Sequence, residues 1–312
     1  MMNSDELIFG IDGGGTGCRA ALCRAADGVR LSEGQAGAAN IMTNFDAARE
    51  NIVEACSKAL EMAGLPHDQL PTTSAYLGVA GANAGSYAKK FAAALPFRQC
   101  EVNTDAEISL QGALGNGDGV VAIIGTGSVF ISRFDQQIQT VGGWGFVVGD
   151  LGSGARVGRE LLQETLLAHD HVRKATPITS HILNDFRNNP QTIVEYAHSA
   201  SPGDFGRFAP LVLDYVEQQD VTALRIWNRA VKSVEETLAS IIGERHPRLC
   251  LLGGFGKRYG EYLSGRIAEM VVPAQGSALD GAVDLALRTY AQPAQPAQPA
   301  QPAQPSSQRE AQ

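Results

Sequence analysis

The chain has 312 residues, of which 44% are hydrophobic and 35 are glycine, with a formal net charge of −8 and a pI near 5.3. This length and composition are typical of a globular protein with one large domain or two ordinary ones. The acidity argues against nucleic acid or an anionic membrane surface as the main partner, so a negatively charged substrate would need local positive potential or a metal ion.

The N-terminal segment MMNSDELIFG has no basic region and no long apolar stretch. It therefore predicts neither a signal peptide nor a transmembrane helix, and we expect a cytoplasmic protein. The five cysteines are scattered without a CxxC pair. An odd number of unpaired cysteines is typical of reduced thiols in a reducing compartment.

Residues 7–23 have the pattern of a strand, a tight turn and a second strand. The first apolar run ends in Asp12 and three consecutive glycines, and the second begins at Cys18. Glycine tolerates positive φ and lets backbone N–H groups approach a ligand, so this turn is suited to phosphate oxygens. A plain hairpin turn is the alternative, although it would not need three glycines. The dinucleotide pattern is excluded because a strand, and not a helix, follows the turn. The P-loop pattern is excluded because no stretch of the chain supplies Lys-Ser or Lys-Thr after its second glycine.

The rest of the first half alternates strands and helices, and two polar residues follow predicted strands. Expected elements are a strand at 29–36, a helix at 45–63, a strand at 74–79, a helix at 87–95, a strand at 99–105 and a helix at 106–114. Asn40 lies in a loop of small residues, where it could meet a hydroxylated ligand or form a turn. Asp105 ends a strand, where open α/β sheets place their chemistry, but a helix N-cap is an equal alternative.

A glycine-rich break at residues 115–119 marks the predicted boundary between a domain of residues 1–115 and a domain of residues 116–290. Beyond it the opening pattern recurs, with apolar runs on both sides of Gly125, Thr126, Gly127 and Ser128. A duplicated hairpin indicates two related domains that face each other. Two such turns could hold a polyphosphate from both sides.

The second half carries two more glycine-rich segments. Residues 141–158 contain seven glycines and one carboxylate, Asp150, which could be directed at a ligand hydroxyl. Expected elements are helices at 155–168, 182–186, 193–197, 221–244 and 276–290, and a strand at 248–252. Gly253 and Gly254 form a turn that suits either a flat ring lying on the backbone or a purely structural bend. After residue 290, five Ala-Gln-Pro repeats predict a disordered tail of residues 291–312.

Five motifs, IDGGGTGCRAAL, NTDAEISLQGAL, IIGTGSVF, GGWGFVVGDLGSGA and CLLGGFGK, stand in an order that resembles the sugar-kinase and actin-like ATPase superfamily. The resemblance is strongest to the branch of N-acetylglucosamine kinases and bacterial glucosamine kinases, and it covers roughly residues 8–286. It implies an α/β, two-domain actin-like ATPase (ribonuclease H-like) fold. Duplicated mixed β-sheets flanked by helices would enclose a cleft between the domains, and the last helix could pack back on the N-terminal domain.

The resemblance also implies roles for individual residues. Asp105 would be the catalytic base beside the sugar 6-hydroxyl, and Asp12 would assist Mg²⁺ through water. The remaining implied contacts are Gly14, Gly15, Thr16, Thr126, Gly127 and Ser128 to the ATP phosphates, Gly253 and Gly254 to adenosine, and Asn40, Asp105, Gly143, Trp144 and Asp150 to the sugar. Leu151 departs from the pattern, because many relatives have an acidic or amide residue there, and this bears on the choice of sugar.

We therefore predict an ATP-dependent kinase that phosphorylates glucosamine at the 6-hydroxyl to give glucosamine 6-phosphate, in the breakdown of amino sugars such as those derived from chitin. N-acetylglucosamine is the alternative substrate. The expected partners are the amino sugar and ATP, with neither nucleic acid nor membrane, and a homodimer is an option. A less favoured alternative is an ATPase activator of an iron–sulfur reductase, which shares this fold but needs clustered cysteines.

Overall fold

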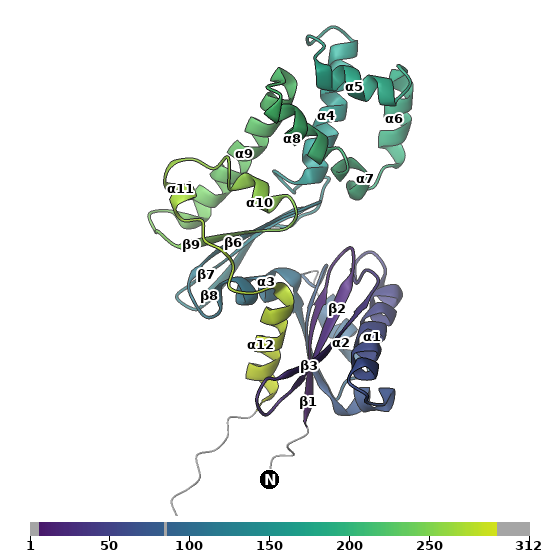
Figure 1. The fold of residues 1–312 in the computed structure, drawn as a ribbon, viewed down its shortest axis with the longest axis vertical. Coiled ribbons are helices and arrows are strands. Elements are labelled where there is room, and N and C mark those ends of the chain that lie inside the picture. The colour runs from purple at the N-terminus through teal and green to yellow at the C-terminus, as the bar shows by residue number, and fades with distance from the viewer. Residues whose placement is uncertain (1–5, 84–85, 292–312) are drawn as a thin grey trace, which may run out of the picture.

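The computed structural model describes residues 6–83 and 86–291, and contains two mixed β-sheets, one in each half of the molecule (Figure 1). The first has the strand order β3-β2-β1-β4-β5 and the second β8-β7-β6-β9. The strands are β1 Leu7–Gly13, β2 Cys18–Arg24, β3 Arg30–Ala36, β4 Ser74–Val79, β5 Gln99–Thr104, β6 Gly119–Ile124, β7 Ser128–Phe134, β8 Gln137–Gly142 and β9 Arg248–Leu252. The predicted Ala-Gln-Pro tail lies outside the described residues from residue 292 onward.

The two sheets repeat one arrangement. In each, an antiparallel meander of three strands (β1 to β3, or β6 to β8) is followed by a strand parallel to its first member, β4 or β9. The first sheet adds β5, parallel to β4. The predicted duplication of mixed sheets is therefore confirmed. Because strands β1, β4 and β5 are parallel, their carboxyl ends meet at one edge, which faces the second half of the molecule in Figure 1.

Helices cover both sheets. They are α1 Phe45–Met62, α2 Tyr87–Ala94, α3 Asp105–Leu114, α4 Gly154–His169, α5 Pro177–Asp185, α6 Pro190–Ser199, α7 Pro202–Gly206, α8 Ala209–Glu217, α9 Val221–Ile242, α10 Gly256–Tyr259, α11 Gly265–Glu269 and α12 Ala278–Tyr290, with a 3₁₀ helix at His67–Thr72. The helices predicted at 45–63, 106–114, 155–168 and 221–244 are confirmed within two residues at each end.

The sequence prediction missed or shortened some elements of the second half. Strand β8 was not expected, because its turn from β7 uses Asp135 and Gln136 with positive φ in place of glycine. The helices between residues 177 and 217 were predicted only as two short pieces, because each has ten residues or fewer and therefore few positions that show a helical period. The stronger signal was a proline at the start of α5, α6 and α7, directly after a Thr, Asn or Ser cap.

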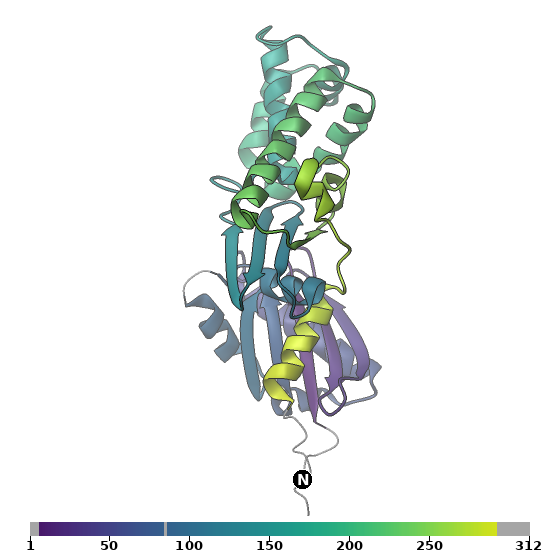
Figure 2. The same cartoon turned by 90° about the vertical axis from the view of Figure 1, so that its left-hand side faces the viewer.

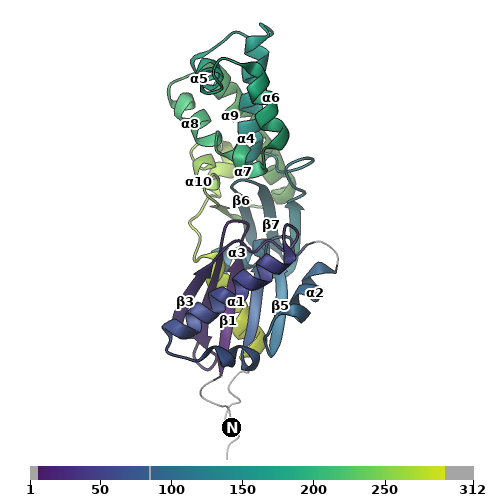
Figure 3. The same ribbon diagram turned by 90° about the vertical axis from the view of Figure 1, so that its right-hand side faces the viewer.

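Helices α1 and α12 lie on opposite faces of the first sheet. Figure 3 shows α1 in front of the sheet, and Figure 2 shows α12 on the other face. Cys18 of β2 is buried on the α1 side and Cys23 on the α12 side, as their odd separation predicts. All five cysteines are free, and burial raises the pKa of Cys18 to about 12, so this thiol stays protonated.

Helix α12 packs on the first sheet although it ends the described chain. A side chain at Gly10 of β1 would come within 2.5 Å of the Val283 backbone, and one at Gly281 would come within 2.0 Å of the Ile108 carbonyl of α3. Glycine therefore permits this close helix packing. We propose two domains, of residues 1–115 and 116–290. Helix α12 belongs to the second domain by sequence but packs on the first.

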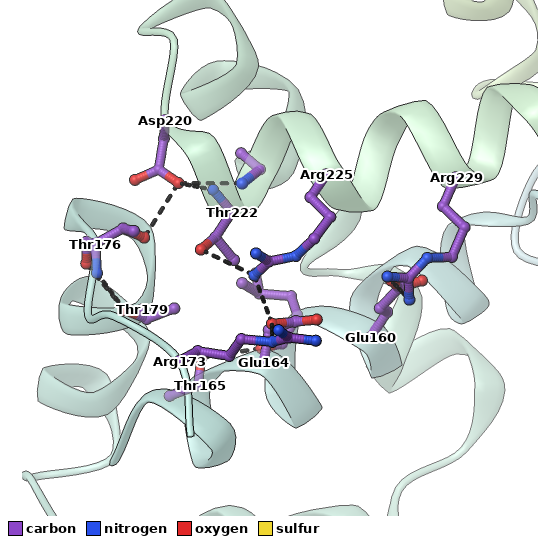
Figure 4. A network of polar contacts seen from close by, with 12 residues as sticks. Glu160, Glu164, Thr165, Arg173, Thr176, Thr179, Asp220, Thr222, Arg225 and Arg229 are labelled. Carbon is purple, nitrogen blue, oxygen red and sulfur yellow. Dashed lines mark hydrogen bonds and ion pairs between the residues drawn. The ribbon is translucent and has the colours of Figure 1, made fainter. Parts of the chain in front are cut away.

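The helices above the second sheet are joined by the polar network of Figure 4. Asp220 caps α9 by accepting hydrogen bonds from the Thr222 and Ala223 N–H groups and also accepts one from the Thr176 hydroxyl. The buried Glu164 of α4 pairs with Arg225 of α9 at 2.6 Å. Because removing Arg225 would leave the buried Glu164 charge with only the longer contact to Arg173 at 3.9 Å, the pair with Arg225 stabilises the packing of α4 against α9. Within the described parts of the chain, no helix is both long and apolar enough to cross a membrane.

Candidate functional site

The last residues of β1, β4 and β5 lie side by side at the carboxyl edge of the first sheet. Gly13 of β1 is paired with Val79 of β4, and Val79 with Thr104 of β5. Asp105 follows Thr104 directly, so it lies two strands away from the first glycine turn, about 10 Å at ordinary strand spacing. The strand register thus places the predicted base beside the predicted phosphate-binding turn.

The first glycine turn is closed by the Gly14 N–H, which donates to the Gly17 carbonyl at 2.9 Å. Its Gly14 carbonyl accepts from the Ala39 N–H at 2.9 Å, which ties the turn to the loop that contains Asn40. Gly15 faces open space, since no atom lies within 4 Å of the place where a Cβ would stand. A ligand can therefore approach the backbone at this turn closely.

Asp12 carries the only ion pair observed at this turn within the described chain. Its carboxylate meets the Arg19 guanidinium at 2.7 Å, because the two residues are register partners across the β1–β2 hairpin. The Asp12 side chain is 17% exposed. The sequence prediction missed Arg19, although the hairpin pairing could have identified it once the turn length was known.

Asp105 is the first residue of α3, and Thr104 is the N-cap that accepts a hydrogen bond from the Glu107 N–H at 3.2 Å. One Asp105 oxygen accepts from the Ala106 N–H at 2.9 Å. Burial raises the pKa of Asp105 above its ordinary value, and the nearby Asp12 carboxylate raises it further. Burial therefore distinguishes Asp105 from an exposed aspartate, whose pKa is about 3.9. A raised pKa brings a general base closer to the pH at which it would work.

Asn40 forms the turn that was one of its two predicted roles. Its side-chain oxygen accepts from the Met42 and Thr43 N–H groups at 3.0 and 3.2 Å. Asn40 also bridges Ala80, the residue after β4, so it lies at the same sheet edge as Asp105. With the oxygen engaged, the amide NH₂ is the group that Asn40 can offer to a ligand.

The second and third glycine turns meet at the carboxyl end of β6. The Ile124 carbonyl accepts from the Phe255 N–H at 3.1 Å, and the next carbonyl, of Gly125, accepts from the Gly154 N–H at 2.8 Å. A Cβ at Gly253, where φ is +82°, would stand 2.4 Å from the Ile124 oxygen. Three loops, at residues 125–128, 150–154 and 253–255, are thus joined through backbone hydrogen bonds.

Asp150 is 9% exposed, and its backbone has a φ of +53°, which is uncommon for a residue other than glycine. Its carboxylate lies against Gly127, where an added Cβ would be 2.9 Å from one Asp150 oxygen. Burial raises the pKa of Asp150, while the backbone N–H groups of Ser128 and Gly145 act in the opposite direction. The structure therefore places Asp150 directly beside the second glycine turn.

Trp144 and the residues after it form an exposed apolar loop. The Trp144 side chain is 76% exposed, and Val147 and Val148 are each 82% exposed. Gly143 precedes them with a φ of +71° and donates its N–H to the Ser128 carbonyl at 3.1 Å. Gly143 is thus joined to the second glycine turn, whereas Trp144 makes little contact with the other predicted site residues.

An open pocket of about 860 Å³ lies elsewhere, between α4, α6, α7 and the loop that contains Phe146 and Val147. It is lined mainly by apolar side chains and includes none of the predicted site residues.

Within residues 6–83 and 86–291, no three His, Cys, Asp or Glu side chains form a group that could hold a metal.

Comparison with known proteins gives consistent results. The profile of the BadF/BadG/BcrA/BcrD ATPase family matches residues 9–283. The chain is 34% identical over 282 residues to a glucosamine kinase of Vibrio cholerae, covering 90% of this chain and 96% of that protein. It is 27% identical over 147 residues to an N-acetyl-D-glucosamine kinase of Dictyostelium discoideum, covering 45% of this chain and 46% of that one.

A solved structure from Chromobacterium violaceum, provisionally described as an N-acetylglucosamine kinase, superposes with a TM-score of 0.84. It is 28% identical and covers 91% of this chain and 100% of that one. The predicted two-sheet α/β architecture of actin-like type is confirmed by this comparison and by the strand order of both sheets.

The buried position of Asp105 predicts an effect on stability. Its folded-state pKa lies above the unfolded value of about 3.9, so the folded protein binds more protons between these two values. Stability therefore falls as pH rises through this interval. We expect Asp105→Asn, which keeps the acceptor for Ala106, to unfold at a higher temperature than the unsubstituted protein at pH 7. The difference should shrink towards pH 4 in thermal unfolding experiments.

Asp204→Asn is the control, because its effect on the unfolding temperature at pH 7 should have the opposite sign. Hydrogen bonds from Ser201 lower the pKa of this exposed carboxyl group, so its charged form stabilises the fold above the unfolded pKa. The Asp204 variant should unfold at a lower temperature at pH 7. An Asp105 variant that is no more stable than the unsubstituted protein at pH 7 would contradict the buried, charged state of Asp105.

Proposed function

Because the chain belongs to the BadF/BadG/BcrA/BcrD ATPase family, we propose that it is an ATP-dependent kinase that phosphorylates the 6-hydroxyl of glucosamine. One observation carries the proposal. The strand register sets Asp105 beside the first glycine turn, on the edge of the first sheet that faces the second half of the molecule (Figure 1). This arrangement provides backbone groups for a phosphate chain and a carboxylate for an acceptor hydroxyl.

The glycine turns would bind the nucleotide. We assign Gly14, Gly15 and Thr16 in the first half, and Thr126, Gly127 and Ser128 in the second, to the ATP phosphates. Gly253 and Gly254 would lie against adenosine, and a Cβ added at Gly254 would have no atom within 4 Å, which leaves room for a flat ring. Phosphoryl transfer has a loose transition state, so alignment of donor and acceptor by these turns is the main contribution expected of the protein.

Mg²⁺ is proposed to bind near Asp12, largely through water. Mg²⁺ prefers oxygen ligands and is usually held by one or two carboxylates together with water and substrate phosphates, which fits a site with few protein ligands. When bound, the ion neutralises charge on the phosphate oxygens. Arg19, now paired with Asp12, is a cation positioned beside the same turn.

Asp105 would act on the sugar. Its carboxylate would accept the proton of the 6-hydroxyl as the hydroxyl oxygen bonds to the terminal phosphorus, while the bond from that phosphorus to the bridging oxygen breaks and ADP leaves. The raised pKa makes the carboxylate a stronger base than an exposed aspartate. Asn40, Gly143, Trp144 and Asp150 are the further proposed sugar contacts, and closure of the two halves would exclude water that competes as acceptor.

N-acetylglucosamine is the second candidate substrate. Leu151 follows Asp150 directly and is 49% exposed. An apolar side chain at this place would suit the methyl of an acetyl group better than the ammonium of glucosamine. Glucosamine remains the first candidate, because the glucosamine kinase relative is 34% identical over 90% of this chain, whereas the structure described as an N-acetylglucosamine kinase is 28% identical over 91% of it.

A homodimer and a cytoplasmic location are further parts of the proposal. The exposed apolar side chains of Trp144, Val147 and Val148 are consistent with contact to another surface, either the first half of the same chain or a second copy. Light scattering gives the mass in solution, and a monomeric mass at micromolar concentration would exclude the dimer.

The substrate proposal is tested by ADP release from Mg-ATP with each sugar. We expect sugar-dependent turnover with glucosamine and a kcat/KM at least tenfold higher than with N-acetylglucosamine, since the two sugars differ in the charge at carbon 2. Glucose, which lacks the nitrogen, is the control. The reverse order would establish the N-acetylglucosamine alternative, and no turnover with any hexosamine would refute the kinase proposal.

Asp105→Asn tests the catalytic role. The change removes the base while keeping the size of the side chain, so kcat should fall on the order of 10²-fold or more while ATP binding stays unchanged. Glu107→Gln is the matched control, because Glu107 lies in the same first turn of α3 and burial also raises its pKa. The control should keep kcat within about threefold, and equal turnover in both variants would remove Asp105 from the role.

A further inference from the structure

The loop that contains Asp150 is held from two sides. On one side, the Ser128 hydroxyl donates to the Leu151 carbonyl at 2.8 Å, which ties the loop to the second glycine turn. On the other side, the Tyr259 hydroxyl donates to the Gly152 carbonyl. The two bonds reach consecutive carbonyls directly after Asp150, so together they fix the backbone that orients its carboxylate.

Tyr259 belongs to the element that follows the third glycine turn. It is the last residue of α10, its side chain is fully buried, and its ring lies 4.6 Å from that of Trp227 and 6.0 Å from that of Phe255. Phe255 in turn donates its N–H to the Ile124 carbonyl beside the second turn. The Tyr259 ring thus has a fixed position relative to both nucleotide-side turns.

Gly152 cannot move towards α9 to compensate for a lost bond. Its φ is +74°, and an added Cβ would lie 2.5 Å from the Val234 side chain and 3.1 Å from the Tyr259 hydroxyl. The peptide is therefore closely packed between α9 and α10. If the Tyr259 hydroxyl were removed, the buried Gly152 carbonyl would lose this donor, and the loop would have to rearrange to find another.

We propose that Tyr259 is a positioning residue that joins the nucleotide end of the site to the loop of residues 150–153. Through the Gly152 carbonyl it sets the position of Asp150 before the sugar arrives, so less ordering is required on binding. The inference rests on the proposed function, because the contact of Asp150 with the sugar is part of it. Tyr259 itself touches neither the sugar nor the nucleotide in this account.

Tyr259→Phe removes only the hydroxyl, and Tyr262→Phe is the matched control. Tyr262 belongs to the same aromatic cluster, with its ring 5.2 Å from that of Trp227, and its hydroxyl makes no hydrogen bond to residues 6–83 or 86–291. Two measurements are needed: deuterium uptake of peptides covering residues 143–154 in the free protein, and the KM values for sugar and ATP.

We expect faster deuterium uptake in residues 143–154 for Tyr259→Phe and unchanged uptake for Tyr262→Phe. The sugar KM should rise about tenfold in the Tyr259 variant, the order expected when one buried carbonyl loses its donor, while the ATP KM changes by less than about twofold. A purely structural role would instead change both KM values alike, or change neither.

Unchanged deuterium uptake in the Tyr259 variant would overturn the inference, as would faster uptake without a selective rise in the sugar KM. If the unsubstituted protein phosphorylates a hexosamine, either result leaves the proposed function intact. If it phosphorylates none, the proposed function fails, and with it the sugar-positioning role of Tyr259. The uptake measurement then still decides whether the hydroxyl holds the loop.

Discussion

The carbonyl group of Ile124, at the end of β6, is the point on which the second half of the site depends. It accepts the Phe255 N–H, and it lies where any side chain at residue 253 would collide with it. The following carbonyl, of Gly125, accepts from the first residue of α4. Backbone hydrogen bonds at two consecutive peptides therefore bring together three loops that are far apart in the sequence. The glycines of these loops are needed because the chains approach too closely for a Cβ.

In the proposed function, this construction would allow an acidic chain to bind a polyanion. The formal net charge is −8, and the cation observed at the first turn, Arg19, is already paired with Asp12. Backbone N–H groups carry partial positive charge that does not depend on basic side chains, and the proposed Mg²⁺ would supply the remainder. The carboxylates of Asp105 and Asp150 are destabilised in their charged form, because burial raises the pKa of both. A charged group kept in a buried site lowers stability in exchange for function.

Local features of the site could be predicted from the sequence, and long-range ones could not. The glycine turns and the position of Asp105 at a strand end follow from patterns of a few residues. The Asp12–Arg19 pair follows from hairpin register, which needs only the length of one turn. In contrast, the Tyr259 hydroxyl meets a carbonyl 107 residues away, and no local pattern indicates that contact. The raised pKa of Asp105 cannot be predicted from a local pattern either, since burial is a property of the packed molecule.

In the proposed function, turns from both halves hold one nucleotide while Asp105 faces the acceptor hydroxyl. A crystal structure with Mg²⁺, a non-hydrolysable ATP analogue and glucosamine tests it most directly. The account predicts phosphate oxygens in contact with residues 14–16 and 126–128 together, and an Asp105 oxygen within about 3 Å of the sugar 6-hydroxyl. Phosphates that contact only one of the two turns, or an Asp105 carboxylate directed away from the sugar, would contradict it.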